Sequence, residues 1–223
     1  MAVQVEHIKS IPYFAGLSSA ELESIKSLVF EVEAERGKLL LLEGEPSESL
    51  YFVVSGAVKV FKTSADGKEQ ILQIMRPGEA FNEVPVFDGG LNLATAQAMG
   101  PVVIYGIKKE NLETILRNHS KVALNAIRVL SQKLRHVVSL VEDLSFRHVN
   151  ARVAKILLEY ASDGSGDRQR LTQQEMAAMA GTAREMIGRS LKDLMDEGII
   201  RLERHRIVIA DKEALKKMAG MVA

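Results

Sequence analysis

LTQQEMAAMAGTAREMIGRSLKDLMDEGII, residues 171–200, reads as two short helices joined by a tight turn. Thr172 is placed to cap the first helix, and Glu175 three residues later completes a capping box. Gly181 supplies the turn. The residues expected to face inward are small or apolar: Met176, Ala177, Ala180, Ile187, Leu191 and Leu194. This pattern predicts a helix-turn-helix, in which the second helix lies in the major groove of DNA.

The second helix carries charged side chains on its outward side. Arg184, Glu185 and Arg189 fall within about half a turn of one another. Arginine can bond to guanine and glutamate can accept from cytosine, so these residue types suit direct readout of base pairs. Thr182, just before the helix, is added to the expected DNA contacts. A solvated charged helix is the alternative, but this spacing directly after a well-formed turn favours DNA binding.

Composition limits the possible function classes. The 223 residues have a formal net charge of zero. That charge is unevenly spread: residues 1–146 hold 15 basic and 18 acidic side chains, whereas residues 147–223 hold 14 and 11. The C-terminal part can therefore contact a few phosphates. Without cysteine, disulfides and thiolate metal sites are excluded. No signal peptide or long apolar run is visible, which predicts a cytoplasmic protein with no membrane partner.

The sequence pattern of the N-terminal half changes from helical to strand-like along the chain. Residues 7–30 suggest short helices, with Ser18 and Ser19 as caps. Short apolar runs separated by glycine-containing turns follow, and Asp66-Gly67 marks the clearest hairpin. These runs are Lys38–Leu42, Ser49–Ser55, Val58–Thr63, Glu69–Met75, Thr95–Met99 and Val102–Ile107. Many short strands at near-regular spacing predict a small antiparallel barrel or roll.

A long helix is expected over 123–144. Its apolar residues recur at spacings of three and four, as in a coiled coil: Ile127, Leu130, Leu134, Val137, Val141 and Leu144. The helix could pack on its own barrel, but so narrow a stripe favours a parallel homodimer. Residues 151–162 form a further amphipathic helix, and 199–202 with 207–209 form the hairpin of a winged helix, with His205 in the wing. We therefore expect a sensing domain at 1–120, a dimerisation helix at 121–145 and a DNA-binding domain at 146–223.

This order of elements resembles the CRP/FNR superfamily of bacterial transcription regulators. The resemblance rests on FVVSGAVKV at 52–60, DGKEQIL at 66–72, PGEAFNE at 77–83, DLSF at 143–146 and AREMIGRSLK at 183–192. It implies an α+β protein with an N-terminal β-roll (a cupin-like jelly roll), a long dimerisation helix and a C-terminal winged helix-turn-helix. It also implies that Arg184, Glu185 and Arg189 read palindromic DNA with TGTGA-like half-sites. RNA polymerase is an implied partner.

The implied effector pocket departs from the cyclic-AMP branch. Glu83 is kept, but Asn82 replaces the family glycine, and Asn92 and Leu93 stand where that branch has an Arg-Ser pair for the phosphate. Residues 77–107 contain no lysine or arginine at all. Val137 and Val138 take the positions of the polar pair that meets the purine. A buried phosphate needs cationic donors, so we expect an effector other than cyclic AMP.

The sequence around the implied pocket, EVPVF at 83–87 and ATAQA at 94–98, resembles that of the nitric-oxide-responsive branches of the family. Those branches are associated with haem. Without cysteine, a haem would need histidine or another non-thiolate ligand. His7 is the candidate, and His119 is the next choice. Another small apolar or anionic metabolite is the alternative effector. A non-regulatory β-roll interaction module is the alternative function, and no nucleophile–base set or phosphate-binding loop points to an enzyme.

Overall fold

The computed structural model describes residues 3–160, 171–203 and 206–221. It divides into two compact units, each discontinuous in sequence. The first comprises Met1–Lys62 and Leu72–His136, and the second comprises Thr63–Ile71 and Val137–Ala223. The division falls inside the long helix, so the units have different bounds from the three segments expected from the sequence.

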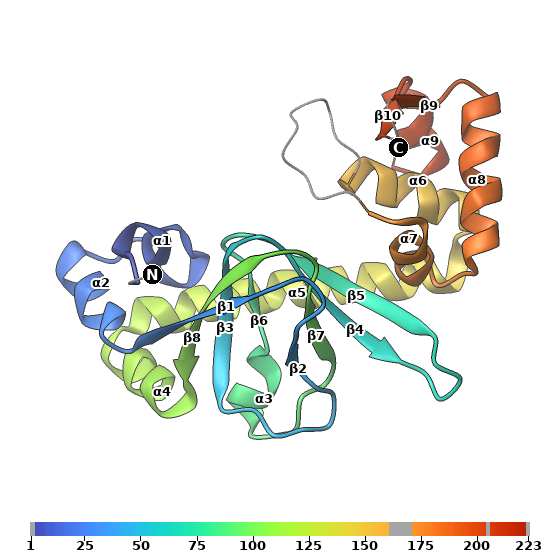
Figure 1. Cartoon of the computed structure of the whole chain (residues 1–223). Helices are drawn as coiled ribbons and strands as arrows, with labels where there is room; N and C mark the ends of the chain where they lie inside the picture. Colours follow the sequence, from blue (N-terminus) through green and yellow to red (C-terminus); the bar gives the residue numbers. More distant parts are fainter. Residues whose placement is uncertain (1–2, 161–170, 204–205, 222–223) are drawn as a thin grey trace. The chain divides into compact units, whose positions relative to one another are not determined.

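The first unit is a β-roll with helices at one end (Figure 1). Its strands form two four-stranded sheets, in the orders β1-β8-β3-β6 and β2-β7-β4-β5. The strands are β1 (Val29–Ala34), β2 (Leu39–Leu41), β3 (Ser49–Ser55), β4 (Val58–Thr63), β5 (Glu69–Met75), β6 (Ala80–Phe81), β7 (Thr95–Ala98) and β8 (Val102–Lys108). The helices are α1 (Val5–Ser10), the 3-10 turn η1 (Pro12–Phe14), α2 (Ser19–Lys26), α3 (Glu83–Asp88), α4 (Lys109–Asn118) and the first part of α5 (Ser120–Phe146).

The alternation of side chains along β3 divides the core of this unit. Leu50 and Phe52 point to one side, where they pack with the N-terminal helices. Tyr51 and Val53 point to the other side, between the sheets. Successive side chains of a strand point to opposite faces of the sheet. An unbroken apolar run such as β3 therefore places apolar side chains on both faces, and both are buried.

The predicted roll is confirmed, with two strands that the sequence did not indicate. Residues 29–30 were expected to end a helical region, but they begin β1, which pairs antiparallel with β8 from Val29–Ile107 to Ala34–Val102. The helical pattern of the residues before Val29 obscured the start of β1, which is recognised by its pairing with β8. The second, β6, is only two residues long.

The second unit is a winged helix-turn-helix. It contains α6 (Val149–Tyr160), α7 (Gln173–Ala180), α8 (Arg184–Asp196), the antiparallel pair β9 (Ile200–Glu203) and β10 (Arg206–Ile209), and α9 (Lys212–Met218). In Figure 1, α7 lies at the beginning of α8, and β9, β10 and α9 lie toward its end. The β4–β5 turn and the first residues of β5, together Thr63–Ile71, also belong to this unit. From β5, Gln70 Nε2 donates to the Met179 carbonyl at 3.3 Å. His205 lies outside the described residues.

Candidate DNA-reading helix and effector site

The turn before α8 is built as the sequence predicts. Thr172 Oγ1 accepts from the Glu175 amide at 3.1 Å, and Glu175 Oε2 accepts from the Thr172 amide at 2.6 Å. Gly181 has a φ of 59°, and a Cβ there would lie 2.7 Å from Leu144 Cδ2. Both the left-handed backbone and the close approach therefore require glycine. The Thr182 amide then donates to Ala177 at 3.1 Å, which closes the turn.

One face of α8 is fixed by the core. Ile187, Leu191 and Leu194 are fully buried against α6 and α7. Ser190 is also buried, and its hydroxyl bonds to Asn150 on α6. The inward set expected from the sequence is therefore confirmed, and the orientation of the opposite face follows from it.

The opposite face presents the three predicted readers to solvent. Arg184, Glu185 and Arg189 are all exposed, whereas Thr182 is half-buried in the turn. No ion pair among the described residues engages Arg184 or Arg189. The two guanidinium groups and one carboxylate are thus available to base edges, which is the donor and acceptor set that major-groove readout uses.

The candidate effector residues fall into three pairs, of which Asn82 and Glu83 are the first. Asn82 has a φ of 74°, which explains why glycine suits this position and why asparagine can replace it. Its amide donates to Ser49 O at 3.0 Å and to the Ser47 hydroxyl. Asn82 therefore holds the start of α3 against the beginning of β3.

Glu83 is buried and is engaged by two side chains that the sequence analysis did not include. Lys133 Nζ on α5 lies 2.6 Å from Glu83 Oε1, and the Tyr13 hydroxyl donates to the same oxygen at 3.3 Å. Lys133 also donates to the Ala80 carbonyl. Burial, with the neighbouring negative charge of Glu83, raises the pKa of the Tyr13 phenol far above its usual value.

Asn92 and Leu93, the second pair, lie between α3 and β7. Asn92 is buried, and its side-chain amide donates to Leu42 O at 2.9 Å. Its Oδ1 has no hydrogen-bond partner among the described residues. Leu93 is 57 % exposed, and its carbonyl accepts from Lys62 Nζ at 3.1 Å. Lys62 is paired with Glu43 at 2.7 Å.

These contacts change the electrostatic argument made from the sequence. Although residues 77–107 contain no lysine or arginine, the fold brings Lys133 to Glu83 and Lys62 to Leu93. Each lysine is paired with a glutamate, so an anionic ligand would have to compete with a carboxylate for either cation. The inference that no cation lies near these residues was wrong. The composition of residues 77–107 does not show which charged side chains other strands and helices bring to them.

Val137 and Val138, the third pair, lie on α5 within the second unit, and both are about half exposed. They continue an apolar stripe along this helix. Ile127, Leu134 and Val141 are each more than half exposed, Leu144 is 38 % exposed, and Leu130 is partly buried. Soluble proteins rarely expose so many large apolar side chains in one continuous stripe, so the stripe marks a surface that a partner covers.

Comparisons with known proteins agree with this architecture. Residues 31–119 match the family described as cyclic nucleotide-binding domain, and residues 151–218 match the Crp-like helix-turn-helix domain. The chain is 32 % identical over 213 residues to the CRP-like cAMP-activated global transcriptional regulator of Mycobacterium tuberculosis, and the match covers 92 % of this chain and 95 % of the relative. The chain belongs to the CRP/FNR family of transcription regulators.

Two further proteins show how far the similarity extends. The chain is 31 % identical to the cyclic AMP receptor protein of Thermus thermophilus, with 95 % of this chain and 98 % of the relative covered. The structure of FixK2 from Bradyrhizobium japonicum is similar with a TM-score of 0.78 at 25 % identity, over 87 % of this chain and 99 % of that one. The Mycobacterium relative is named a transcriptional regulator, and the C-terminal match is to a helix-turn-helix domain, so this chain is a DNA-binding transcription regulator of the same family.

The histidines of this CRP/FNR protein were the candidate haem ligands. His7 is exposed, and its Nδ1 lies 3.2 Å from the Tyr105 hydroxyl beside a cavity of about 110 Å³. His119 Nδ1 lies 3.3 Å from Glu21 Oε1. Within the described ranges, no three His, Asp or Glu side chains are grouped to hold a metal ion. The cavity at His7 is well below the roughly 300–1,000 Å³ of ordinary ligand pockets, so the surroundings of His7 do not fit a haem.

The joint between α5 and α6 contains an ionic cluster that the sequence analysis missed. Asp143 is buried, and its Oδ1 lies 2.7 Å from Arg147 Nε while its Oδ2 contacts Lys155 Nζ on α6. Arg147 also reaches the Ala219 carbonyl, at the end of α9. The cluster thus ties the end of the long helix to two other helices of the DNA-binding unit.

A helix long and apolar enough to cross a membrane is not found among the described residues.

Proposed function

We propose that this protein is an effector-gated homodimeric regulator that binds palindromic DNA through α8. The observation that carries the proposal is the outward face of α8, where Arg184, Glu185 and Arg189 are exposed directly after a capped turn. A family resemblance gives the expected half-site, TGTGA, with two half-sites about one helical turn, roughly 34 Å, apart.

The experiment is a fluorescence-anisotropy titration against that palindrome and against random DNA. Arg184→Ala and Arg189→Ala should each cost about 1–3 kcal/mol on the palindrome and relax discrimination at one base pair. Lys212→Ala, which removes an exposed charge from α9 in the same unit, is the control for loss of charge alone. Equal weakening on both DNAs would mean that the arginines contact phosphates and that the readout assignment is wrong.

The homodimer in this proposal forms through the apolar stripe of α5. A recognition helix of one winged unit contacts only one half-site, and family regulators of this kind use a twofold partner for the other. The stripe consists of Ile127, Leu130, Leu134, Val137, Val141 and Leu144, at coiled-coil spacing. RNA polymerase is the expected further partner.

The effector in this proposal is a ligand other than cyclic AMP. The candidate residues are Asn82, Glu83, Asn92 and Leu93 in the first unit and, from the family resemblance alone, Val137 and Val138 on α5. Asn92 and Leu93 are uncharged where the cyclic-AMP branch has an Arg-Ser pair, and the two lysines nearby are each paired with a glutamate. The side chains of Val137 and Val138 cannot hydrogen-bond a purine. Calorimetry with cyclic AMP tests the exclusion, and micromolar binding would overturn it.

Cyclic AMP is the second candidate for the effector, because the Mycobacterium and Thermus relatives are named for it. The observation that favours it is Lys133, a cation for which a phosphate could compete with Glu83. A small anionic metabolite would use the same cation. If cyclic AMP binds, Lys133→Met should weaken it; if it does not bind wild type, an anion of another shape remains the candidate.

Nitric oxide sensing through haem, with His7 as ligand, rests on the resemblance alone, since the residues around His7 do not fit the group. An absorption spectrum of protein purified from haem-replete cells, with and without nitric oxide, tests it. A haem absorption band that is lost in His7→Ala would support haem binding through His7. Wild-type protein without such a band would exclude this hypothesis.

A further inference from the structure

Gly188 is the fifth residue of α8, in the interior of the DNA-reading helix. Its φ is not among the positive values of the chain, so the backbone there does not require glycine. Apart from its two chain neighbours and the nearby backbone of α8 itself, a Cβ at Gly188 would meet no atom of the described residues within 4 Å. Packing inside the protein therefore does not require glycine at this position either.

Glycine is nonetheless unfavourable here. It is the poorest helix former after proline, because its backbone loses the most freedom on folding. At Gly181 the same residue type is explained by a positive φ and by the approach of Leu144. At Gly188 neither explanation applies, so the cause lies outside the described parts of this chain.

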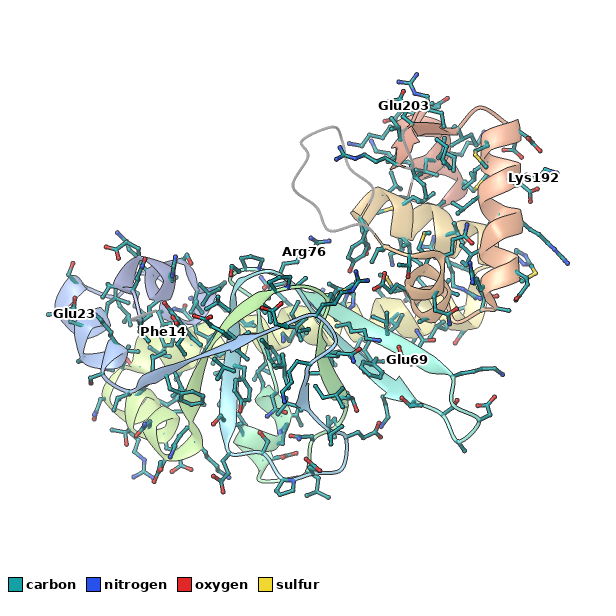
Figure 2. The ribbon with its side chains drawn as sticks, viewed as in Figure 1. Phe14, Glu23, Glu69, Arg76, Lys192 and Glu203 are labelled. Carbon is teal, nitrogen blue, oxygen red and sulfur yellow. The ribbon has the colours of Figure 1, made fainter. Side chains whose placement is uncertain are left out.

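The surroundings of Gly188 identify that cause. With 3.6 residues per turn, Gly188 lies about 40° around the helix from Arg184 and about 60° from Glu185. Lys192 is one turn further on, and Figure 2 shows it on the outer side of α8. Gly188 is therefore a gap between the long side chains of the DNA-reading face, where the helix backbone itself can meet a partner.

We propose that Gly188 is a positioning residue that lets the backbone of α8 approach DNA closely in the major groove. The inference rests on the proposed DNA readout by this helix and adds a requirement to it. A methyl group at Gly188 would touch the DNA and hold the helix away from the base edges. Arg184 and Arg189 would then lose the short, aligned bonds that discriminate bases.

The test is Gly188→Ala in the full-length protein, with Gly188→Leu as a larger substitution by another good helix former. Because both residues favour the helix, the melting temperature should stay the same or rise, by about 2–4 °C for alanine. Affinity for the palindrome should fall at least tenfold for alanine and further for leucine, whereas affinity for random DNA should change less than twofold. Asp193→Ala, an exposed change on the same helix, controls for helix propensity and should not weaken binding.

Two results would overturn the inference. Palindrome affinity within twofold of wild type for both variants would show that no close approach exists. A melting temperature several degrees lower would show that Gly188 serves the fold. Failure of the proposed function is distinguishable, because wild-type protein would then not prefer the palindrome to random DNA, and the inference would fall with it.

Discussion

The buried pair of Glu83 and Lys133 gives a prediction whose size follows from the structure. The side chains are 6 % and 22 % exposed, and their charged atoms lie 2.6 Å apart. In Lys133→Met, the carboxylate of Glu83 loses its cation and keeps, among the described side chains, the Tyr13 hydroxyl at 3.3 Å. Removing one partner of a buried pair typically costs 3–5 kcal/mol. Because Lys133 is partly open to water, we expect a loss of about 3 kcal/mol in the free energy of unfolding.

Removing both partners should be far milder, since no charge is then left buried without its counterpart. Glu83→Gln combined with Lys133→Met should lose about 1 kcal/mol, which gives a coupling energy of at least 2 kcal/mol in a double-mutant cycle. Lys62→Met is the matched control. Its pair with Glu43 is 51 % and 37 % exposed, so it should contribute less than about 1 kcal/mol.

Urea unfolding followed by tyrosine fluorescence is a suitable assay, because the chain has no tryptophan and Tyr13, Tyr51 and Tyr105 all lie in the first unit. The reasoning is refuted if Lys133→Met loses no more than Lys62→Met. It is also refuted if the double variant loses as much as the sum of its single changes.

Two other predictions concern assembly and titration. Leu134→Glu should place like charges across the proposed dimer seam, so the protein should sediment as a monomer and bind the palindrome weakly, whereas Gln132→Glu, off the stripe, should remain dimeric. Asp66 in the β4–β5 turn has its pKa lowered to about 2, chiefly by a hydrogen bond from Lys68 and then by one from Ser64. The stabilisation from this carboxylate should be complete above about pH 4 and lost as the pH falls toward 2. Carboxyl NMR should show the pKa of Asp66 rising toward its ordinary value in Lys68→Ala, while the hydrogen bond from Ser64 keeps it below that value. An ordinary value already in wild type would contradict the hydrogen bonds.

Features encoded by neighbouring residues could be predicted from the sequence. The capping box of Thr172 and Glu175, the turn at Gly181 and the strand bounds of β3, β4 and β5 were all predicted and are confirmed. In each case the signal is a short-range pattern of capping, of positive φ or of alternating burial. The identity of the outward face of α8 followed from the same periodicity.

Features that join distant segments could not be predicted in this way. Lys133 lies off the apolar stripe of α5, and nothing near it in the sequence names Glu83 as its partner. Tyr13 likewise reaches Glu83 only because α5 holds its segment, through bonds from Asn125 to the Tyr13 and Ala15 carbonyls at 3.1 Å. The candidate effector residues were therefore chosen without the two side chains that engage Glu83.

The hydrogen bond from Gln70 to Met179 has a consequence for genetics. Residues 63–71 are encoded among the strands of the sensing roll, yet they belong to the compact unit that carries α7 and α8. Substitutions in this turn should therefore score as defects in operator binding although they map to the first third of the gene. A fragment that starts at Val137 would lack residues 63–71 and therefore part of its own unit.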